Sequence, residues 1–279
     1  MEMLKSSPAG HRCPELSVNT ILCDSLPEYG SPLNEVINLY NETKPRAGCL
    51  DMWNAFMVKG ARFTMGSDIP LCPCTAVQPP TELISYEDAK RFLKNSVKQD
   101  PDFHKDAYVH FYIDDQKFDG KRDGIWQKPQ EALKIIRHFS GIISPDFSTN
   151  ADFPDPLKRY NTYRMRAFGY WVATHNIPVI NNVRWGAEET WSYCFDGIPY
   201  RSIVAIGTVA SGIRKLENRP LFEQGLLQMV KLLNPRMIIV YGSSNFSFFR
   251  DLPKTTAVIQ FPSSTSLVFA SKRGGDQSE

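Results

Sequence analysis

Short apolar runs alternate with helix-like segments through the second half of the chain, and each run stops at small or polar residues. The clearest run, Ala107–Ile113, alternates tyrosine and histidine with valine, phenylalanine and isoleucine, which predicts a strand. Strands that alternate with amphipathic helices favour a parallel sheet. The runs expected to be parallel neighbours in one sheet are 107–113, 141–145, 178–183, 202–206 and 237–241.

Helix signals lie between and before these runs. Ser85 is followed three residues later by Asp88, which predicts an N-cap and a helix that continues to about Val97. Asn234-Pro235 predicts the end of a later helix. The remaining predicted elements are strands at 60–65 and 255–261 and helices at 33–40, 128–139, 156–176, 187–195 and 221–233.

The predicted fold is a single α/β core domain over residues 60–262. A TIM-barrel-like or partial barrel is the preferred architecture, and a doubly wound open sheet is the alternative, because periodicity does not separate the two. Residues 1–59 are expected to form an irregular N-terminal extension packed on the core. Residues 263–279 are expected to form a polar C-terminal tail.

Composition narrows the class of protein. The chain has 279 residues, 42% hydrophobic and 22% charged, as is usual for a soluble globular protein. Its net charge of +2 comes from well-mixed acidic and basic residues, which gives no case for broad nucleic-acid or membrane-surface binding. No apolar run is long enough to span a membrane, and the first residues do not resemble a secretory signal, so a cytoplasmic protein is expected.

One predicted helix concentrates basic and aromatic residues. Such a mixture could bind nucleic acid through phosphate contacts and base stacking. The alternative is that the aromatic residues pack the helix onto the sheet while the arginines face solvent. The basic residues are Lys158, Arg159, Arg164 and Arg166.

Candidate functional residues follow the predicted strands, because parallel sheets collect their active groups at the carboxyl ends of the strands. Asp115, Asp146 and Glu188 are the candidate acid–base groups, and Arg184 and Trp185 are candidates for holding an anionic group and a ring. The alternative is local: an aspartate can cap a helix or open a turn, and Glu188 can interact with a helix dipole. Asp146 and Arg184 are expected to meet at one mouth, where replacing Arg184 with alanine would remove ligand binding and barely change stability.

Two small-residue loops follow the late strands. Thr208 lies in the first, and Ser243 and Asn245 lie in the second, so backbone amides there are candidates for phosphate binding. Neither loop matches a P-loop or a dinucleotide fingerprint, and tight turns explain both equally well.

The six cysteines lack the spacing of a disulfide framework, so reduced thiols are expected. Cys72 and Cys74 form a single C-x-C pair without the second pair typical of zinc sites, and no metal site is predicted. No motif indicates a particular cofactor.

Several motifs together resemble the Domain of Unknown Function 4417 family, which is common in bacteriophages and in mobile elements of Firmicutes. The resemblance implies a phage or mobile-element context, with roles such as nucleic-acid maintenance, nucleotide handling or interference with host defence, and it implies no particular reaction. The segments that carry it are 144–148, 161–167, 177–180, 183–186, 193–199 and 240–242.

Three functions follow from these observations. The first is binding of a small anionic, nucleotide-like ligand at the strand carboxyl ends, with hydrolase or lyase activity as a possibility. The second is a non-catalytic phage protein that binds and inhibits a host defence protein through residues 1–59. The third is a nucleic-acid-associated accessory protein.

Overall fold

The protein is an α/β domain built on one parallel sheet. The structure, a computed structural model, describes residues 36–37, 51, 53–96, 98, 100–264 and 266. Within these residues seven strands form a sheet in the order of the chain, and all neighbouring strands are parallel. The five runs that the sequence predicts to be parallel neighbours form the five central strands of this sheet. The strands are β3 (Leu83–Ser85), β4 (Lys105–His110), β5 (Phe139–Ile143), β6 (Val179–Asn182), β7 (Ile203–Gly207), β8 (Met237–Tyr241) and β9 (Ala257–Phe261).

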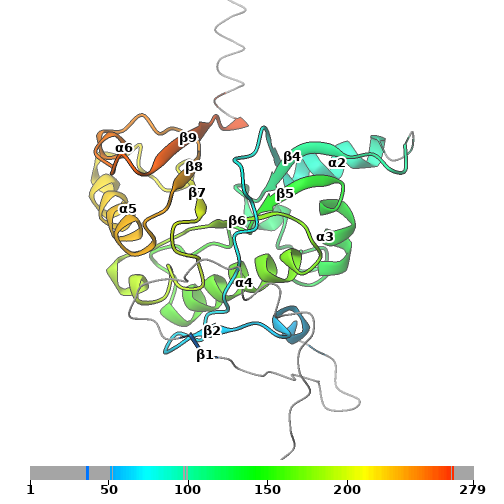
Figure 1. The fold of residues 1–279 in the computed structure, drawn as a ribbon, viewed down its shortest axis with the longest axis horizontal. Helices are drawn as coiled ribbons and strands as arrows, with labels where there is room; N and C mark the ends of the chain where they lie inside the picture. The colour runs from blue at the N-terminus through cyan, green and yellow to red at the C-terminus, as the bar shows by residue number, and fades with distance from the viewer. Residues whose placement is uncertain are drawn as a thin grey trace, which may run out of the picture.

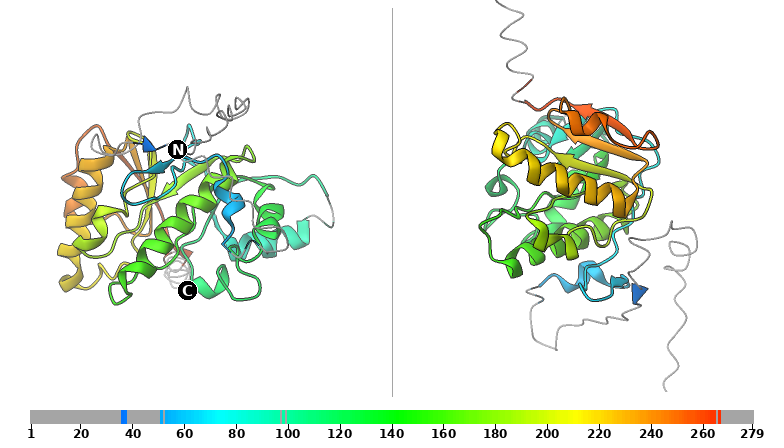
Figure 2. Two further views of the ribbon diagram at one scale, coloured as in Figure 1. Left: turned by 90° about the horizontal axis from the view of Figure 1, so that it is seen from below. Right: turned by 90° about the vertical axis from the view of Figure 1, so that its left-hand side faces the viewer.

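The sheet curls into a half-barrel, with the main helices on its outer side (Figure 1). The side view in Figure 2 shows helices covering the sheet in one layer. The sequential strand order excludes the doubly wound alternative, which requires a reversal of strand order. The helices are α2 (Tyr86–Ser96), α3 (Pro129–Ile136), α4 (Asp155–Ala173) and α5 (Arg219–Leu233).

Apolar faces of these helices pack on the outer face of the sheet. In α4, Met165, Phe168 and Val172 are fully buried at helical spacing against strand residues such as Val109 and Ile142. Helix α2 begins as predicted, because the backbone N–H of Asp88 donates to Oγ of Ser85 at 3.1 Å. Helix α5 ends at Asn234, which has a left-handed φ of 41°.

An aromatic stripe on β4 and the residues after it fills the inside of the half-barrel. Tyr108 and Tyr112 require glycine on other strands, since a Cβ at Gly141 would lie 2.5 Å from the Tyr108 ring and one at Gly207 would lie 2.8 Å from the Tyr112 ring. The rings of Tyr112 and Tyr241 stack with centroids 5.1 Å apart. The ends of β4 and β8 therefore meet across the interior although three strands separate them in the sheet.

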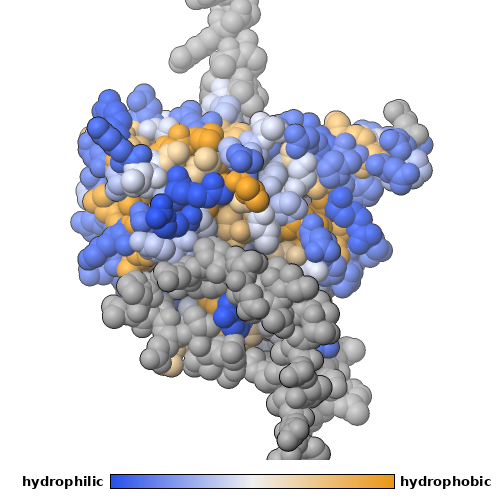
Figure 3. All heavy atoms as spheres, viewed as in Figure 1, coloured by the Kyte–Doolittle hydropathy of each residue, from blue (hydrophilic) through white to orange (hydrophobic). Residues whose placement is uncertain are grey.

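A plug segment, residues 72–77, runs across the amino ends of the central strands, and Figure 1 shows this part of the chain crossing the middle of the half-barrel. The backbone N–H of Thr75 donates to the carbonyl of Val179 at 3.1 Å, and Oγ1 of Thr75 accepts from the Val179 N–H at 2.9 Å. Farther along, Arg236 donates to the carbonyl of Val77 at 2.8 Å. Apolar patches are exposed near the centre of this face (Figure 3), and Val77 itself is 72% exposed.

Some predicted elements differ in the structure. The expected strand at 60–65 shortens to β2 (Phe63–Thr64), which pairs antiparallel with β1 (Val36–Ile37) outside the main sheet. Val36–Ile37 was predicted to be helical, and the rest of that helix lies outside the described residues. Strand β3 was not predicted at all, because three residues are too few for a period-two pattern.

The remaining elements are short helices. The helix expected at 187–195 is only a 3-10 helix, η3 (Glu188–Ser192). The proposed domain limits at residues 59 and 263 stay predictions, since most of 1–59 and nearly all residues after 264 lie outside the described part. The other short elements are η1 (Ala55–Val58), η2 (Asp115–Lys117), η4 (Leu216–Asn218) and α6 (Ser247–Arg250).

A candidate ligand-binding cleft

A cleft of about 800 Å³ lies at the carboxyl ends of β4 to β7. Its polar wall comes from the loops after β4 and β5 and from Arg184 after β6, and its apolar wall comes from Trp185 after β6, the loop after β7 and the start of α5. This is where a parallel α/β sheet normally binds its ligands. Four predicted site residues line it: Asp115, Asp146, Arg184 and Trp185.

The predicted meeting of Asp146 and Arg184 occurs in this cleft. Nη1 of Arg184 lies 2.7 Å from Oδ2 of Asp146, and Nδ2 of Asn182 donates to Oδ1 of the same carboxylate at 2.8 Å. Burial raises the pKa of Asp146 above its usual value, even though Arg184 and the Asn182 hydrogen bond act in the opposite direction. Asp146 is thus a largely buried acceptor, and both of its oxygens are engaged.

Tyr112 forms the floor of the cleft with Tyr241. Its hydroxyl donates to Oδ1 of Asn182 at 2.9 Å, which fixes the Asn182 amide so that its nitrogen faces Asp146. Burial raises the pKa of Tyr112 well above its ordinary value, so this phenol stays protonated and acts as a donor.

Asp115 is held on the opposite side of the polar wall. Its two oxygens accept hydrogen bonds from the backbone N–H of Ser148 at 3.2 Å and from the Ser148 hydroxyl at 3.0 Å. The carbonyl of Ser148 in turn accepts from Nδ2 of Asn161 on α4. Arg164, one turn further along α4, donates to Oδ1 of Asn161 at 2.7 Å and to Oδ2 of Asp119 at 2.6 Å.

A second arginine of α4 supports the Asp146 side. Arg166 is fully buried, and its guanidinium donates to the carbonyls of Asn182 at 2.9 Å, Asp196 at 3.0 Å and Cys194 at 3.1 Å. Burial lowers the pKa of Arg166 to about 10, which still leaves it charged at neutral pH. Helix α4 therefore holds both sides of the polar wall.

These contacts correct the place that both interpretations gave to the arginines of the basic helix, whereas Phe168 and Trp171 do pack in the core as the alternative predicts. Arg164 and Arg166 neither face solvent nor form an accessible basic groove, because they are 8% and 0% exposed. Lys158 is also buried and pairs with Glu189 at 2.8 Å. A helix that borders a polar site can bury arginine and lysine side chains when carbonyl and carboxylate oxygens accept their hydrogen bonds. The periodicity of the sequence does not reveal these acceptors.

Trp185 belongs to the apolar wall. Its ring centroid lies 5.0 Å from that of Phe222 on α5. Gly225 makes room for the indole, since a Cβ there would lie 2.1 Å from Nε1 of Trp185. The same wall includes Val209 and Leu221, which are 41% and 39% exposed.

The other four predicted site residues lie outside the lining of the cleft. Glu188 is exposed on η3. The buried Thr208 hydroxyl donates to the carbonyl of Ser243 at 3.0 Å, and Oγ of Ser243 accepts from the N–H of Asn245 at 3.2 Å. The two late loops therefore bind one another, as the tight-turn alternative anticipates, and the phosphate-binding role of these residues stays a prediction.

Sequence reasoning missed Tyr112, Ser148 and Asn182, which connect the candidate residues. Asn182 and Tyr112 do stand at the ends of predicted strands, so their positions carried a signal. Their hydrogen-bond partners, however, lie on other strands and loops and become visible only in the fold.

The described residues show no further chemical centre. They contain no cluster of three or more histidine, cysteine or acidic side chains that could hold a metal ion. Cys72, Cys74 and Cys194 are free thiols, and burial raises the pKa of Cys72 to about 12. In the same part of the chain, no helix has the length and apolar character needed to cross a membrane.

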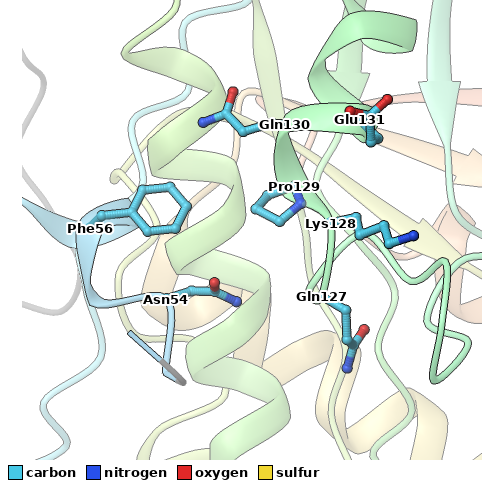
Figure 4. A pocket seen from close by; sticks show the side chains of 7 residues that line it. All are labelled: Asn54, Phe56, Gln127, Lys128, Pro129, Gln130 and Glu131. Atoms are coloured by element: carbon cyan, nitrogen blue, oxygen red, sulfur yellow. The ribbon is translucent and has the colours of Figure 1, made fainter. Parts of the chain in front are cut away.

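A second hollow of about 590 Å³ lies between η1 and the start of α3 (Figure 4). Its lining combines neutral amides such as Asn54 and Gln127 with Phe56, Lys128 and Glu131. The amide of Asn54 is already used, because it donates to the carbonyl of Trp126 at 2.5 Å. This hollow offers no converging set of groups comparable with the cleft.

Comparison with known proteins shows where the chain belongs. Residues 61–262 match the model of a family described as "Domain of unknown function (DUF4417)". The chain is 31% identical over 147 residues to the Gene 1 proteins of Mycobacterium phages L5 and D29, which covers 52% of this chain and 62% and 52% of those relatives. The chain thus matches little more than half of their length, and no solved structure matches it. Because the family model spans most of the chain, the protein belongs to the DUF4417 family.

Proposed function

We propose that the protein binds a small molecule in the cleft at the carboxyl ends of β4 to β7. The observation that carries this proposal is the convergence of Asp115, Asp146 and Arg184 from three successive strand ends on one cavity of about 800 Å³. Cavities of this size suit metabolites and cofactors. The polar side chains are held in place by hydrogen bonds before any ligand arrives, as binding sites require.

Within this proposal the predicted catalytic groups differ in what they can do. Asp146 is occupied by Asn182 and Arg184, so it serves to orient Arg184. Asp115 accepts only uncharged donors from Ser148 and is the better acid–base group for the predicted hydrolysis or elimination. Glu188 lies outside the cleft lining, so this proposal gives it no role.

The alternative functions have less support. Inhibition of a host protein was assigned to residues 1–59, most of which lie outside the described residues. Nucleic-acid binding through α4 would need accessible cations, whereas Lys158, Arg164 and Arg166 are buried in internal contacts.

The proposal can be tested by screening metabolites for those that raise the melting temperature, and by native mass spectrometry of small molecules that co-purify. A true ligand should stabilise the wild-type protein by mass action and lose this effect in Trp185→Ala or Asp115→Asn. Glu188→Gln is the matched control, since it changes a carboxylate outside the cleft. A ligand whose stabilisation survives both cleft variants binds elsewhere, and that result would refute the proposal.

A further inference from the structure

The acidic and basic side chains that line the cleft carry more negative than positive charge. They are Asp114, Asp115, Asp146 and Arg184. The guanidinium of Arg184 already lies 2.7 Å from Asp146. A phosphate entering the cleft would compete with Asp146 for this cation and would approach two further carboxylates, which repel it. The lining therefore disfavours an anionic group.

The polar wall favours a ligand that donates hydrogen bonds. Asp115 accepts from Ser148 at 3.2 and 3.0 Å, and an ionised carboxylate has about four acceptor positions, so acceptor capacity remains. Asp114, beside it in the lining, is exposed. A pair of neighbouring hydroxyl groups would supply two donors to one carboxylate.

The apolar wall favours a flat ring. Trp185 is packed against Phe222 with centroids 5.0 Å apart, which fixes the orientation of the indole. Val209 and Leu221 are partly uncovered beside it, at 41% and 39% exposure. Aromatic and aliphatic surfaces in this arrangement cover a planar heterocycle well.

We infer that the cleft binds a nucleoside without a 5′-phosphate, with its base against the Trp185 wall and its ribose hydroxyls on Asp115. This inference rests on the proposed function, because it names the ligand class of the same cleft. It keeps the base and sugar of the nucleotide-like ligand that the sequence predicts, and it removes the anionic group. The cavity of about 800 Å³ is large enough for such a molecule.

Matched ligands provide the test. Adenosine, guanosine, cytidine and uridine are each compared with the 5′-monophosphate and the 2′,3′-dideoxy form by isothermal titration calorimetry. At least one nucleoside should bind, and its monophosphate and dideoxy forms should each bind about tenfold or more weakly, which corresponds to the loss of one good polar interaction or to one repulsive contact.

Substitutions in the polar wall test whether its carboxylates cause the preference for a nucleoside over its monophosphate. Asp115→Asn should weaken the nucleoside and reduce its advantage over the monophosphate, and Asp114→Asn should strengthen the monophosphate. Asp123→Asn is the control, because that side chain is 87% exposed and lies outside the lining. Melting curves establish that each variant is folded. The comparison of nucleoside, monophosphate and dideoxy forms uses the wild-type protein, so it tests the inference even if a variant does not fold.

Tighter binding of the monophosphate would overturn the inference and leave the proposed function standing. Absence of binding by all four nucleosides would also overturn it. In that case the proposed function fails only if the broader metabolite screen finds no ligand of the cleft either.

Discussion

Arg184 and Asp146 depend on each other unequally. The side chains are 20% and 12% exposed, and burial already raises the pKa of Asp146 while its cation is present. The sequence suggests a mouth cation of little importance to stability, but the structure shows a partner that would be left charged and largely buried. Removing one member of such a pair costs more than the pair contributes.

Replacement of Arg184 by methionine should therefore lower the free energy of unfolding by about 2 kcal/mol, less than at a completely buried pair. The double variant Arg184→Met/Asp146→Asn should recover most of the loss, because the uncompensated charge is gone. Urea denaturation measures both. Lys215→Met is the control, since Lys215 lies 4.0 Å from Glu217 and both side chains are more than 70% exposed. Equal stability of Arg184→Met and the wild type would contradict this account.

His110 makes the stability of the folded protein depend on pH. Burial lowers its pKa from 6.5 to about 3, although Asp88 acts in the opposite direction. Its ring lies 4.3 Å from that of Tyr241, and Nδ1 accepts the backbone N–H of Tyr112 at 3.2 Å. Because the unfolded chain binds the proton near pH 6.5 and the folded protein does not, stability falls as the pH drops below 6.5, by about 1.4 kcal/mol per unit down to about pH 3.

His110→Asn keeps an acceptor for the Tyr112 amide and removes the titrating ring. The variant should be less stable at pH 7, owing to lost packing, and should show a flatter loss of stability between pH 6.5 and 4. Chemical denaturation across this range compares the slopes. The raised pKa values of Asp146 and Asp119 act in the opposite direction in both proteins, so the difference between the slopes isolates His110. Parallel slopes would show that His110 is not the acid-sensitive group.

Helix α4 organises the polar wall at the scale of elements. One side of the wall depends on Asn161 and Arg164, which support Ser148 and thereby Asp115. The other side depends on Arg166, which holds the end of β6. Two buried arginines on one helix thus set the positions of two carboxylates that come from different loops.

Arg164→Met should destabilise the protein by about 3 kcal/mol, because Asp119 is left charged and largely buried. It should also loosen Ser148 and broaden the resonances of that loop in NMR spectra. Arg159→Met on the same helix is the control, since Arg159 is 40% exposed and lies 3.9 Å from Asp155. A similar small effect of both substitutions would contradict a supporting role for Arg164.

Gly225 allows a test of the contact between helix α5 and Trp185. In an exposed helix, glycine to alanine stabilises by about 1 kcal/mol. Here the new Cβ would lie 2.1 Å from Nε1 of Trp185, so Gly225→Ala should instead destabilise by about 1–3 kcal/mol. Gln224→Ala, exposed on the same helix, should be nearly neutral. A stabilised Gly225→Ala variant would show that Trp185 is free to move away from α5.

The sequence predicts those elements that carry a strong local pattern. Strand β8 matches its predicted range, and Ser85 marks the start of α2. Two features without local patterns were missed: β3, which is only three residues long, and the buried state of Arg164 and Arg166, which depends on carbonyls and carboxylates far along the chain. Asp146 and Arg184 could be paired from sequence because adjacent parallel strands end at the same edge.

At the scale of the whole molecule, the half-barrel is closed differently at its two ends. Tyr112 and Tyr241 stack across the carboxyl end, beneath the cleft. The plug segment crosses the amino end through Thr75 and Arg236. Cys72 and Cys74 lie in the plug segment, and burial raises the pKa of both thiols.

These thiols report on the plug segment. With Cys13, Cys23 and Cys49 replaced by serine, labelling by a disulfide reagent at pH 8 should be much slower at Cys72 than at an ordinary thiol, because the raised pKa leaves on the order of 10³-fold less thiolate at Cys72. Thr75→Val removes the acceptor of the Val179 N–H and should accelerate labelling of Cys72 and Cys74 by releasing the plug segment. Cys194, buried beneath η3, is the internal control and should keep its rate. Equal acceleration at Cys194 would mean that the whole domain opens as one unit and that the plug segment has no independent motion.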